Sequence, residues 1–325
     1  MTPTTTPTQA DLTRSRRAAL PDRIFWALCV GGGVLVLLIL ALILITTTRQ
    51  AWPAFVQEGP GFVTTNAWVP NRGTFGALAF VYGTLVSSAL ALLFAVPVSI
   101  GIALFLTELA PRRLRGPVIT VIDLLAAIPS VVFGLWGILV VAPAIVHIYR
   151  WIHALVDGVP VLGTVLGEPV STGRGFMTAG LILAIMITPI ITSISREVFS
   201  TVPVAEKHAA LALGATRWEM IKGAVFPHSF GGLIGAVMLG LGRALGETIA
   251  LALVFGASTQ VVANLFASGN AMPAVIVQQW GEAGGMHRNA LVGLGVVLFV
   301  MTVVVNYLAR AIVRRAESRM RGATA

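Results

Sequence analysis

Residues 195–229 read SREVFSTVPVAEKHAALALGATRWEMIKGAVFPHS, and residues 230–256 continue as FGGLIGAVMLGLGRALGETIALALVFG. The first segment is polar, basic and rich in helix-forming residues, and the second is long and apolar enough to cross a bilayer. The apolar segment nevertheless contains two charged residues, Arg243 and Glu247. Charges inside a spanning helix are costly and usually functional. We therefore expect the first segment to meet a partner outside the membrane and the second to handle charge inside it.

The composition of the whole chain indicates an integral membrane protein. Its 325 residues are 56% hydrophobic and only 11% charged, and the mean hydropathy is +0.89. Soluble domains are far more polar, and the apolar runs lack the ten-residue alternation of transmembrane barrels, so each run is predicted to be a helix. The predicted fold class is all-α, a polytopic membrane protein.

Six apolar runs are long enough to cross the hydrocarbon core, which takes about 20 helical residues. They cover residues 24–45, 77–106, 118–141, 176–193, 229–255 and 289–312. Four regions follow from these runs: a disordered Thr/Pro-rich tail at 1–20, a first helix and exposed loop at 21–76, a five-helix core at 77–312 with a polar loop at 194–228, and a basic tail at 313–325.

The basic residues predict the orientation of the chain. With six crossings, both termini and the loop at 194–228 lie on one side, and that side carries sixteen of the 22 Lys and Arg residues. The opposite side carries five, and Arg243 remains in the membrane. Because cytoplasmic loops are enriched in Lys and Arg, both termini and this loop are predicted to be cytoplasmic.

The cytoplasmic loop contains VAEKHAALALGATRWEMIKGAVFP at residues 204–227. This pattern predicts one helix, a break at Gly214, and a second amphipathic helix that Pro227 stops. One interpretation is an ordinary loop with helical propensity. The interpretation that we favour is a docking helix, because Ala209 and Ala210 belong to a small-residue face that another protein can approach closely.

The same loop resembles the coupling motif of the permease subunits of ABC importers, in which Glu-Ala-Ala precedes a glycine and a proline at fixed spacing. Ala209, Ala210, Gly214 and Pro227 fall at the motif's positions. His208 stands where the motif has glutamate, and Glu206 is the nearest acidic residue that can replace it. The resemblance implies that these residues contact a cytoplasmic ATPase: Glu206, His208, Ala209, Ala210, Gly214 and Pro227.

Three further segments narrow the resemblance: IDLLAAIPSVVFGLWG at 122–137, ITPIITSISREVFSTVP at 187–203 and GLGRALGETIALALVFG at 240–256. They are similar to segments of PstC-type permeases of the phosphate-specific importer. That resemblance implies a type I ABC-importer permease fold in the bacterial plasma membrane. It also implies a homologous second permease (PstA-type), an ATPase dimer (PstB-type) and an extracytoplasmic phosphate-binding protein (PstS-type) as partners.

The chain itself is not expected to be an enzyme. No GxxxxGK[ST] nucleotide-binding loop occurs in the sequence. The histidines His147, His153, His228 and His287 have no metal-ligand spacing with one another or with Cys29, so no metal site is predicted. The only cofactor implied is the ATP used by the partner ATPase.

Arg243 and Glu247 are four residues apart, so on a continuous helix they share one face and can pair. One interpretation is a structural pair that fixes helix packing. Even lenient scales assign an isolated charge a cost of about 2.5–3.5 kcal/mol at the centre of a membrane, and an apolar pair would pack without it. We therefore favour a substrate pathway in which Arg243 contacts the anion transiently and Glu247 orients Arg243. The family resemblance implies the same two positions.

Two other functions fit part of this pattern. An importer of another oxyanion, sulfate or molybdate, would share the coupling loop and the topology. A secondary transporter would show inverted internal repeats and sites for a coupling ion instead of a docking loop. The segments at 187–203 and 240–256 favour phosphate, and no internal repeat is evident.

Overall fold

The computed structural model describes residues 19–322, which form helices connected by mostly short loops. The long helices are α1 (Ala19–Glu58), α3 (Leu78–Leu104), α4 (Arg112–Ala127), α6 (Ala142–Val156), α8 (Phe176–Ser200), α11 (Phe226–Gly246) and α14 (Gly285–Gly322). The shorter α-helices are α2 (Gly61–Thr64), α5 (Ser130–Trp136), α7 (Pro160–Val165), α9 (Val204–Ala212), α10 (Arg217–Met220), α12 (Ile249–Val254) and α13 (Met272–Gln279). Three π-helical turns, η3 (Phe105–Leu109), η4 (Gly137–Val141) and η5 (Ile221–Val225), continue neighbouring helices. Strands β1 (Trp68–Val69) and β2 (Thr74–Phe75) form an antiparallel hairpin around the 3-10 turn η2 (Pro70–Arg72).

The chain divides into two units, Met1–Gln50 and Ala51–Ala325, and each is considered by itself. In the first unit the described residues, 19–50, belong to α1 and contain the whole of the first predicted run, 24–45. The tail predicted to be disordered at residues 1–20 lies outside the described residues, apart from Ala19 and Leu20, with which α1 begins.

Six helical stretches in the described part of the chain are long and apolar enough to cross a membrane, as the sequence predicts. They are Arg23–Glu58, Leu78–Leu109, Ser130–Val156, Phe176–Ser200, Arg217–Gly246 and Gly285–Ala311. The predicted all-α fold and the number of spans are therefore confirmed, whereas several predicted bounds are wrong.

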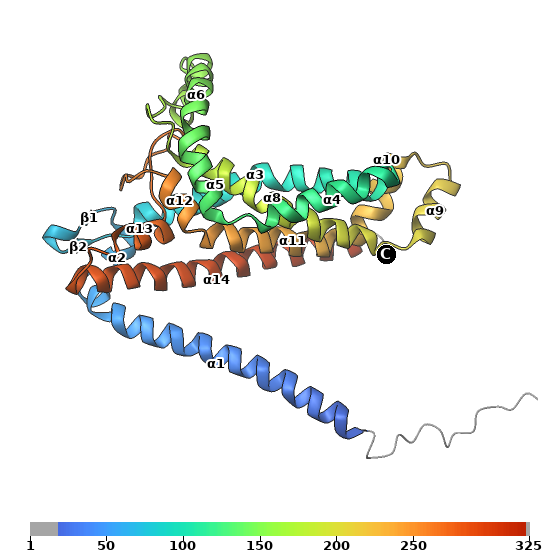
Figure 1. Ribbon diagram of the computed structural model, residues 1–325, viewed down its shortest axis with the longest axis horizontal. Helices are drawn as coiled ribbons and strands as arrows, with labels where there is room; N and C mark the ends of the chain where they lie inside the picture. The colour runs from blue at the N-terminus through green and yellow to red at the C-terminus, as the bar shows by residue number, and fades with distance from the viewer. Residues whose placement is uncertain (1–18, 323–325) are drawn as a thin grey trace, which may run out of the picture. The chain divides into compact units, whose positions relative to one another are not determined.

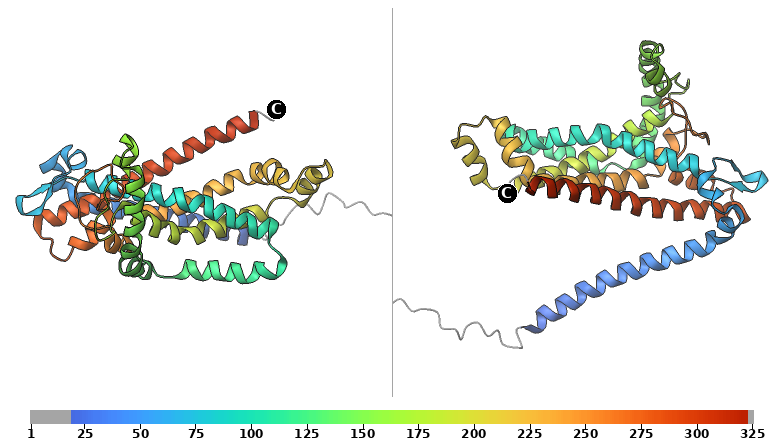
Figure 2. Two further views of the ribbon diagram at one scale, coloured as in Figure 1. Left: turned by 90° about the horizontal axis from the view of Figure 1, so that it is seen from above. Right: turned by 180° about the vertical axis from the view of Figure 1, so that it is seen from behind.

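The core of the second unit lies where α3, α8 and α11 run side by side (Figures 1 and 2). Small and branched side chains fill it, and Leu183 and Ile187 of α8 are fully buried. A Cβ atom added at Gly180 would lie 2.6 Å from the Cβ atom of Leu90, so only glycine allows this approach of α8 to α3. The packing of these helices provides a rigid support for the residues on the outer face of α11.

The two ends of this bundle differ in chemistry. At one end lie α9 and α10 together with the start of α4, and their basic residues come from separate parts of the sequence (Figures 1 and 2). At the other end Trp68 and Phe75 of the hairpin are buried against α13 and α14. The Trp68 indole donates a hydrogen bond to Gln279 Oε1 at 2.8 Å. Trp68 is therefore part of a buried cluster that closes this end of the bundle.

The third predicted run, residues 118–141, is divided in two. Ile128 and Pro129 have extended torsions between α4 and α5, because the residue before a proline is disfavoured in the helical region. The candidate span is instead Ser130–Val156, formed by α5, η4 and α6. Residues 142–175, which the sequence predicts to be a loop between the third and fourth apolar runs, are therefore largely helical, and α6 points away from the bundle (Figures 1 and 2).

The observed helices also differ in their bounds from three other predicted runs. The fourth helix continues to Ser200, so the polar loop is shorter than residues 194–228. The sixth continues to Gly322 and takes in part of the predicted basic tail. The fifth, predicted as one helix over 229–255, is two helices, because α11 ends at Gly246 and α12 begins at Ile249. This last break lies within the segment of the intramembrane charges.

Candidate functional site

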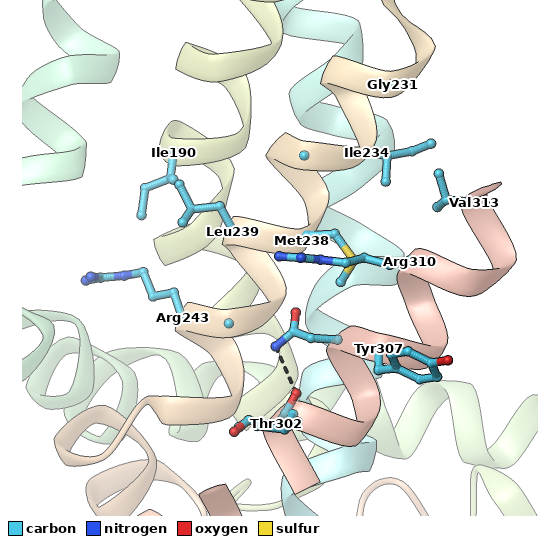
Figure 3. Close-up of a pocket in the computed structure, with 14 residues that line it drawn as sticks. Ile190, Gly231, Ile234, Met238, Leu239, Arg243, Thr302, Tyr307, Arg310 and Val313 are labelled. Carbon is cyan, nitrogen blue, oxygen red and sulfur yellow. Dashed lines mark hydrogen bonds between the residues drawn. The ribbon is translucent and has the colours of Figure 1, made fainter. Parts of the chain in front are cut away.

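An open groove of about 1140 Å³ lies along α11, between α8 and α14 (Figure 3). Its floor is mostly apolar and includes glycines of α11, which leave room because they have no side chains. The lining residues are Ile190, Gly231, Ile234, Gly235, Met238, Leu239, Gly242, Arg243, Thr302, Val303, Asn306, Tyr307, Arg310 and Val313. Two of these fourteen described residues are arginines and none is acidic, so the groove is cationic.

Arg243 lies in the last turn of α11 and is exposed in the groove. Figure 3 shows its side chain leaving α11 on the side away from α14. Among the described residues, no hydrogen bond or ion pair engages its guanidinium group, including none to Glu247. Its five N–H donors are therefore available to an anion.

Glu247 lies at the break between α11 and α12 and is only 7% exposed. The prediction that it pairs with Arg243 on one helical face is wrong, because Glu247 has an extended ψ of 129° and the helix does not continue through it. In the described part of the chain its carboxylate makes neither a hydrogen bond nor an ion pair. Its carboxylate oxygens are not among the buried polar atoms that lack a hydrogen-bond partner, so they remain in contact with solvent although most of the residue is buried.

The opposite wall of the groove carries polar residues that the sequence analysis missed. Thr302, Asn306 and Arg310 are spaced by four residues on α14 and therefore share one face. Asn306 Nδ2 donates a hydrogen bond to the backbone oxygen of Thr302 at 2.9 Å. The four-residue spacing of polar residues in an apolar run was the signal that could have identified this wall.

The docking segment, residues 204–220, comprises α9, a turn at Gly214 and α10. Gly214 has φ +86° and a Cβ atom placed there would meet nothing within 4 Å, so the predicted break is confirmed, and it is a left-handed turn with an open outer surface. Thr216 and Glu219 form a capping box that starts α10. Leu213 is 90% exposed and Trp218 is 62% exposed. Exposed apolar side chains on an ordered turn are typical of a protein contact.

Two side-chain contacts attach α9 to spanning helices. Lys207 Nζ forms an ion pair with Glu108 Oε1 at 2.6 Å, and Glu108 lies in η3, which continues α3. Glu206 Oε2 lies 3.3 Å from His228 Nδ1 in the first turn of α11, a contact that is an ion pair when the histidine is protonated. Of the other predicted docking residues, His208 and Ala209 are exposed, and Ala210 packs against a small core that includes Phe199 and Met220.

Pro227 does not stop the second helix of the loop. It lies in the first turn of α11, and the helix passes through it from α10 by way of η5. Proline removes one backbone N–H and crowds the preceding turn, and a wider π turn relieves both effects. Pro227 therefore begins a spanning helix and contributes indirectly to the docking segment, by directing the chain that enters α11.

Among the described residues, no group of three or more His, Cys, Asp or Glu side chains could hold a metal ion. The cationic groove is suited to binding an anion through charge-assisted hydrogen bonds, and the docking segment is suited to binding a protein. These are two separate surfaces, connected through α11.

The profile of the family described as "Binding-protein-dependent transport system inner membrane component" matches residues 95–322. The chain is 43% identical over 306 residues to the phosphate transport system permease protein PstC of Mesorhizobium japonicum, covering 94% of this chain and 93% of that protein. It is 42% identical over 290 residues to PstC of Haemophilus influenzae, covering 87% and 90%. It is also 42% identical over 274 residues to PstC 1 of Mycobacterium tuberculosis, covering 82% and 81%.

The fold is similar to that of solved ABC transporters. A chain of a bacterial ABC transporter involved in the import of the acidic polysaccharide alginate has a TM-score of 0.57 at 20% identity, covering 92% of this chain and 98% of that one. A chain of the MetNI methionine ABC transporter has a TM-score of 0.51 at 16% identity, covering 76% and 96%. The family profile and the PstC relatives exclude the alternative of a secondary transporter.

Permeases of this kind reside in the inner membrane and do not hydrolyse ATP themselves, since a separate ATPase does so and a binding protein delivers the substrate. The chain belongs to the family of binding-protein-dependent transport system inner membrane components, and within it to the PstC-type permeases of ABC importers.

Proposed function

We propose that this chain forms part of the membrane path through which an ATP-driven importer moves inorganic phosphate into the cytoplasm. The observation that carries the proposal is the cationic groove along α11, which has two arginines and no acidic residue among its described lining residues. Its sequence relatives are named as phosphate transport permeases, which makes phosphate the anion that fits best.

Arg243 is the anion contact in this proposal. Arginine donates two parallel hydrogen bonds from a planar fork, which matches the oxygens of a tetrahedral oxyanion. Its guanidinium group has no hydrogen bond or ion pair to another described residue, so phosphate need not displace an internal partner. Because the groove is open, the contact can form and break during each passage.

Glu247 is the second pathway residue. It lies four residues beyond Arg243 at the break between α11 and α12, mostly buried but with its carboxylate oxygens in contact with solvent. A negative charge at this place opposes the retention of an anion on Arg243. We therefore assign Glu247 to the release of phosphate from Arg243 and not to holding Arg243 in place through a permanent ion pair.

The proposed orientation has both termini and the docking segment in the cytoplasm. The start of α4 and the helices α9 and α10 lie at one end of the bundle and carry Arg112, Arg113, Arg115, Lys207 and Arg217, and such an excess of basic residues favours the cytoplasmic side. The exposed residues at this end, including His208, Ala209 and Gly214, then face an ATPase dimer of the PstB type. A PstA-type permease and a PstS-type phosphate-binding protein complete the proposed assembly.

The test is ATP-dependent uptake of radiolabelled phosphate by vesicles that contain the complete complex, with the binding protein added outside. Unlabelled phosphate should compete, whereas sulfate and molybdate at the same concentration should not. A complex that accumulates sulfate or molybdate and not phosphate would overturn the proposal. A complex with an ATPase variant unable to hydrolyse ATP is the matched control for leakage.

A further inference from the structure

Arg310 is one residue from the end of the last candidate span, Gly285–Ala311, and in the sequence it lies near the end of the apolar run 289–312, just before the basic tail. In that position an arginine has an ordinary explanation, because positive residues at the cytoplasmic ends of spans set topology. The structure instead puts Arg310 on the wall of the groove that contains Arg243. We propose that Arg310 is a second contact for a phosphate-type oxyanion, on the cytoplasmic side of Arg243.

The side chain is free to act in this way. Arg310 is exposed, and no described residue forms a hydrogen bond or an ion pair with it. Figure 3 shows it extending from α14 towards α11, with its guanidinium group near Met238. No acidic residue lies among the described lining residues, so nothing in the groove competes with an anion for its N–H donors.

The two arginines lie at different levels of the groove. Arg310 lies near Met238, which precedes Arg243 by five residues on α11, about 7.5 Å along a helix axis. Because α11 runs away from the docking segment, the Arg310 level is nearer to the cytoplasm in the proposed orientation. An anion released from Arg243 therefore meets Arg310 before it reaches the cytoplasm.

Two weak sites suit transport better than one strong site. Conduction requires binding that is favourable enough for entry and divided between sites so that the ion can leave. Asn306, one helical turn before Arg310, contributes a polar amide to the same wall. The path thus has a cation on each wall, one from α11 and one from α14.

The phosphate group of a lipid has the same chemistry as free phosphate, and an arginine near the end of a span can reach a headgroup. The proposal is that Arg310 serves the transported anion, and it rests on the proposed function. The basic tail contains other arginines, among them Arg315. The single substitution Arg310→Gln therefore preserves the excess of basic residues that sets the membrane topology.

The experiment uses the complete complex in vesicles, and it compares the variants Arg310→Gln, Arg310→Lys and Arg243→Gln. Arg310→Gln should lower the maximal rate of phosphate uptake by about tenfold or more without lowering the yield of complex, because the charge-assisted bonds that are lost are worth about 1.5–3 kcal/mol. Arg310→Lys should keep part of the rate. The matched control is Arg315→Gln on the same helix, outside the groove lining, which should stay within about twofold of the unsubstituted complex.

A second arm identifies the source of the phosphate group. Uptake is measured in vesicles of phosphatidylcholine alone and in vesicles that also contain phosphatidylglycerol. The ratio of Arg310→Gln to unsubstituted uptake should be the same in both. A different result would overturn the proposal and identify Arg310 as a lipid contact: phosphatidylglycerol raises phosphate uptake by the unsubstituted complex, and Arg310→Gln abolishes only this increase, with normal uptake in phosphatidylcholine alone.

The failure of this inference differs from the failure of the proposed function. Full uptake by Arg310→Gln with loss of uptake by Arg243→Gln would refute the second contact and leave the phosphate path intact. Absence of phosphate uptake by the unsubstituted complex would refute both. If Arg310→Gln does not assemble, Arg310→Lys decides: a rate equal to that of the unsubstituted complex, with normal yield, overturns the proposal.

Discussion

At the residue scale, the exposed guanidinium group of Arg243 leads to the first prediction. Arg243→Gln should lower ATP-dependent phosphate uptake by about 10- to 100-fold, since charge-assisted hydrogen bonds contribute about 1.5–3 kcal/mol. Assembly should be unchanged, because no described residue bonds to this side chain. The measurement is uptake per mole of purified complex, with Arg315→Gln as the control. An equal loss of complex yield and uptake would mean that Arg243 is structural.

Glu247 leads to a second prediction because its carboxylate has no partner among the described residues. Glu247→Gln keeps the size of the side chain and breaks no described contact, so the thermal stability of the complex should be unchanged. Phosphate uptake should fall because the anion is no longer repelled from Arg243. The double change Arg243→Gln with Glu247→Gln should transport no better than Arg243→Gln alone. Recovery of transport by the double change would restore the interpretation as a packing pair.

The sequence identified Arg243 and Glu247 as candidate site residues, but it did not predict their geometry correctly. Charges are rare in apolar runs, so Arg243 and Glu247 stand out in any reading of the segment. Their pairing depended on a continuous helix, and no proline marks the break at Glu247. Arg310 was overlooked because its distance from Arg243 in the sequence hides that they line one groove.

At the element scale, the turn at Gly214 leads to the third prediction. Gly214→Val should weaken the association of the ATPase, because a β-branched residue at φ +86° is strained by about 1–3 kcal/mol and adds bulk to an exposed turn. Membrane insertion should be unaffected. Gly223→Val is a matched control, since its Cβ would also meet nothing within 4 Å and its φ is not positive. Undiminished co-purification of the ATPase with Gly214→Val would contradict the prediction.

Long apolar runs predicted the existence of the spanning helices, but they did not predict where several of those helices begin and end. Pro129 divides a run that composition alone treats as continuous, whereas Pro227 fails to end a helix because η5 widens just before it. The same residue type thus has opposite outcomes, decided by whether the preceding backbone can adopt an extended or a π-helical conformation. That choice depends on packing, which a local pattern does not contain.

At the scale of the whole molecule, the fourth prediction concerns orientation. Cysteines introduced at Ser171 and Ser318, in a Cys29→Ser background, should react with a membrane-impermeant maleimide from opposite sides, with Ser171 outside. The basis is the distribution of sixteen basic residues on one predicted side against five on the other. Reaction of both positions from the same side would rule out the six-span topology.

The contacts that Lys207 and Glu206 of α9 make with spanning helices have a consequence for energy transfer. Lys207 joins α9 to Glu108 at the end of α3 and η3, and Glu206 joins it to His228 on α11, the helix that carries Arg243. If α9 shifts when the ATPase changes state, these contacts couple that shift to the groove. Such a coupling free energy is reciprocal. If binding of the ATPase to α9 changes the affinity of the groove for an anion by some factor, an anion in the groove changes the affinity of the ATPase for α9 by the same factor.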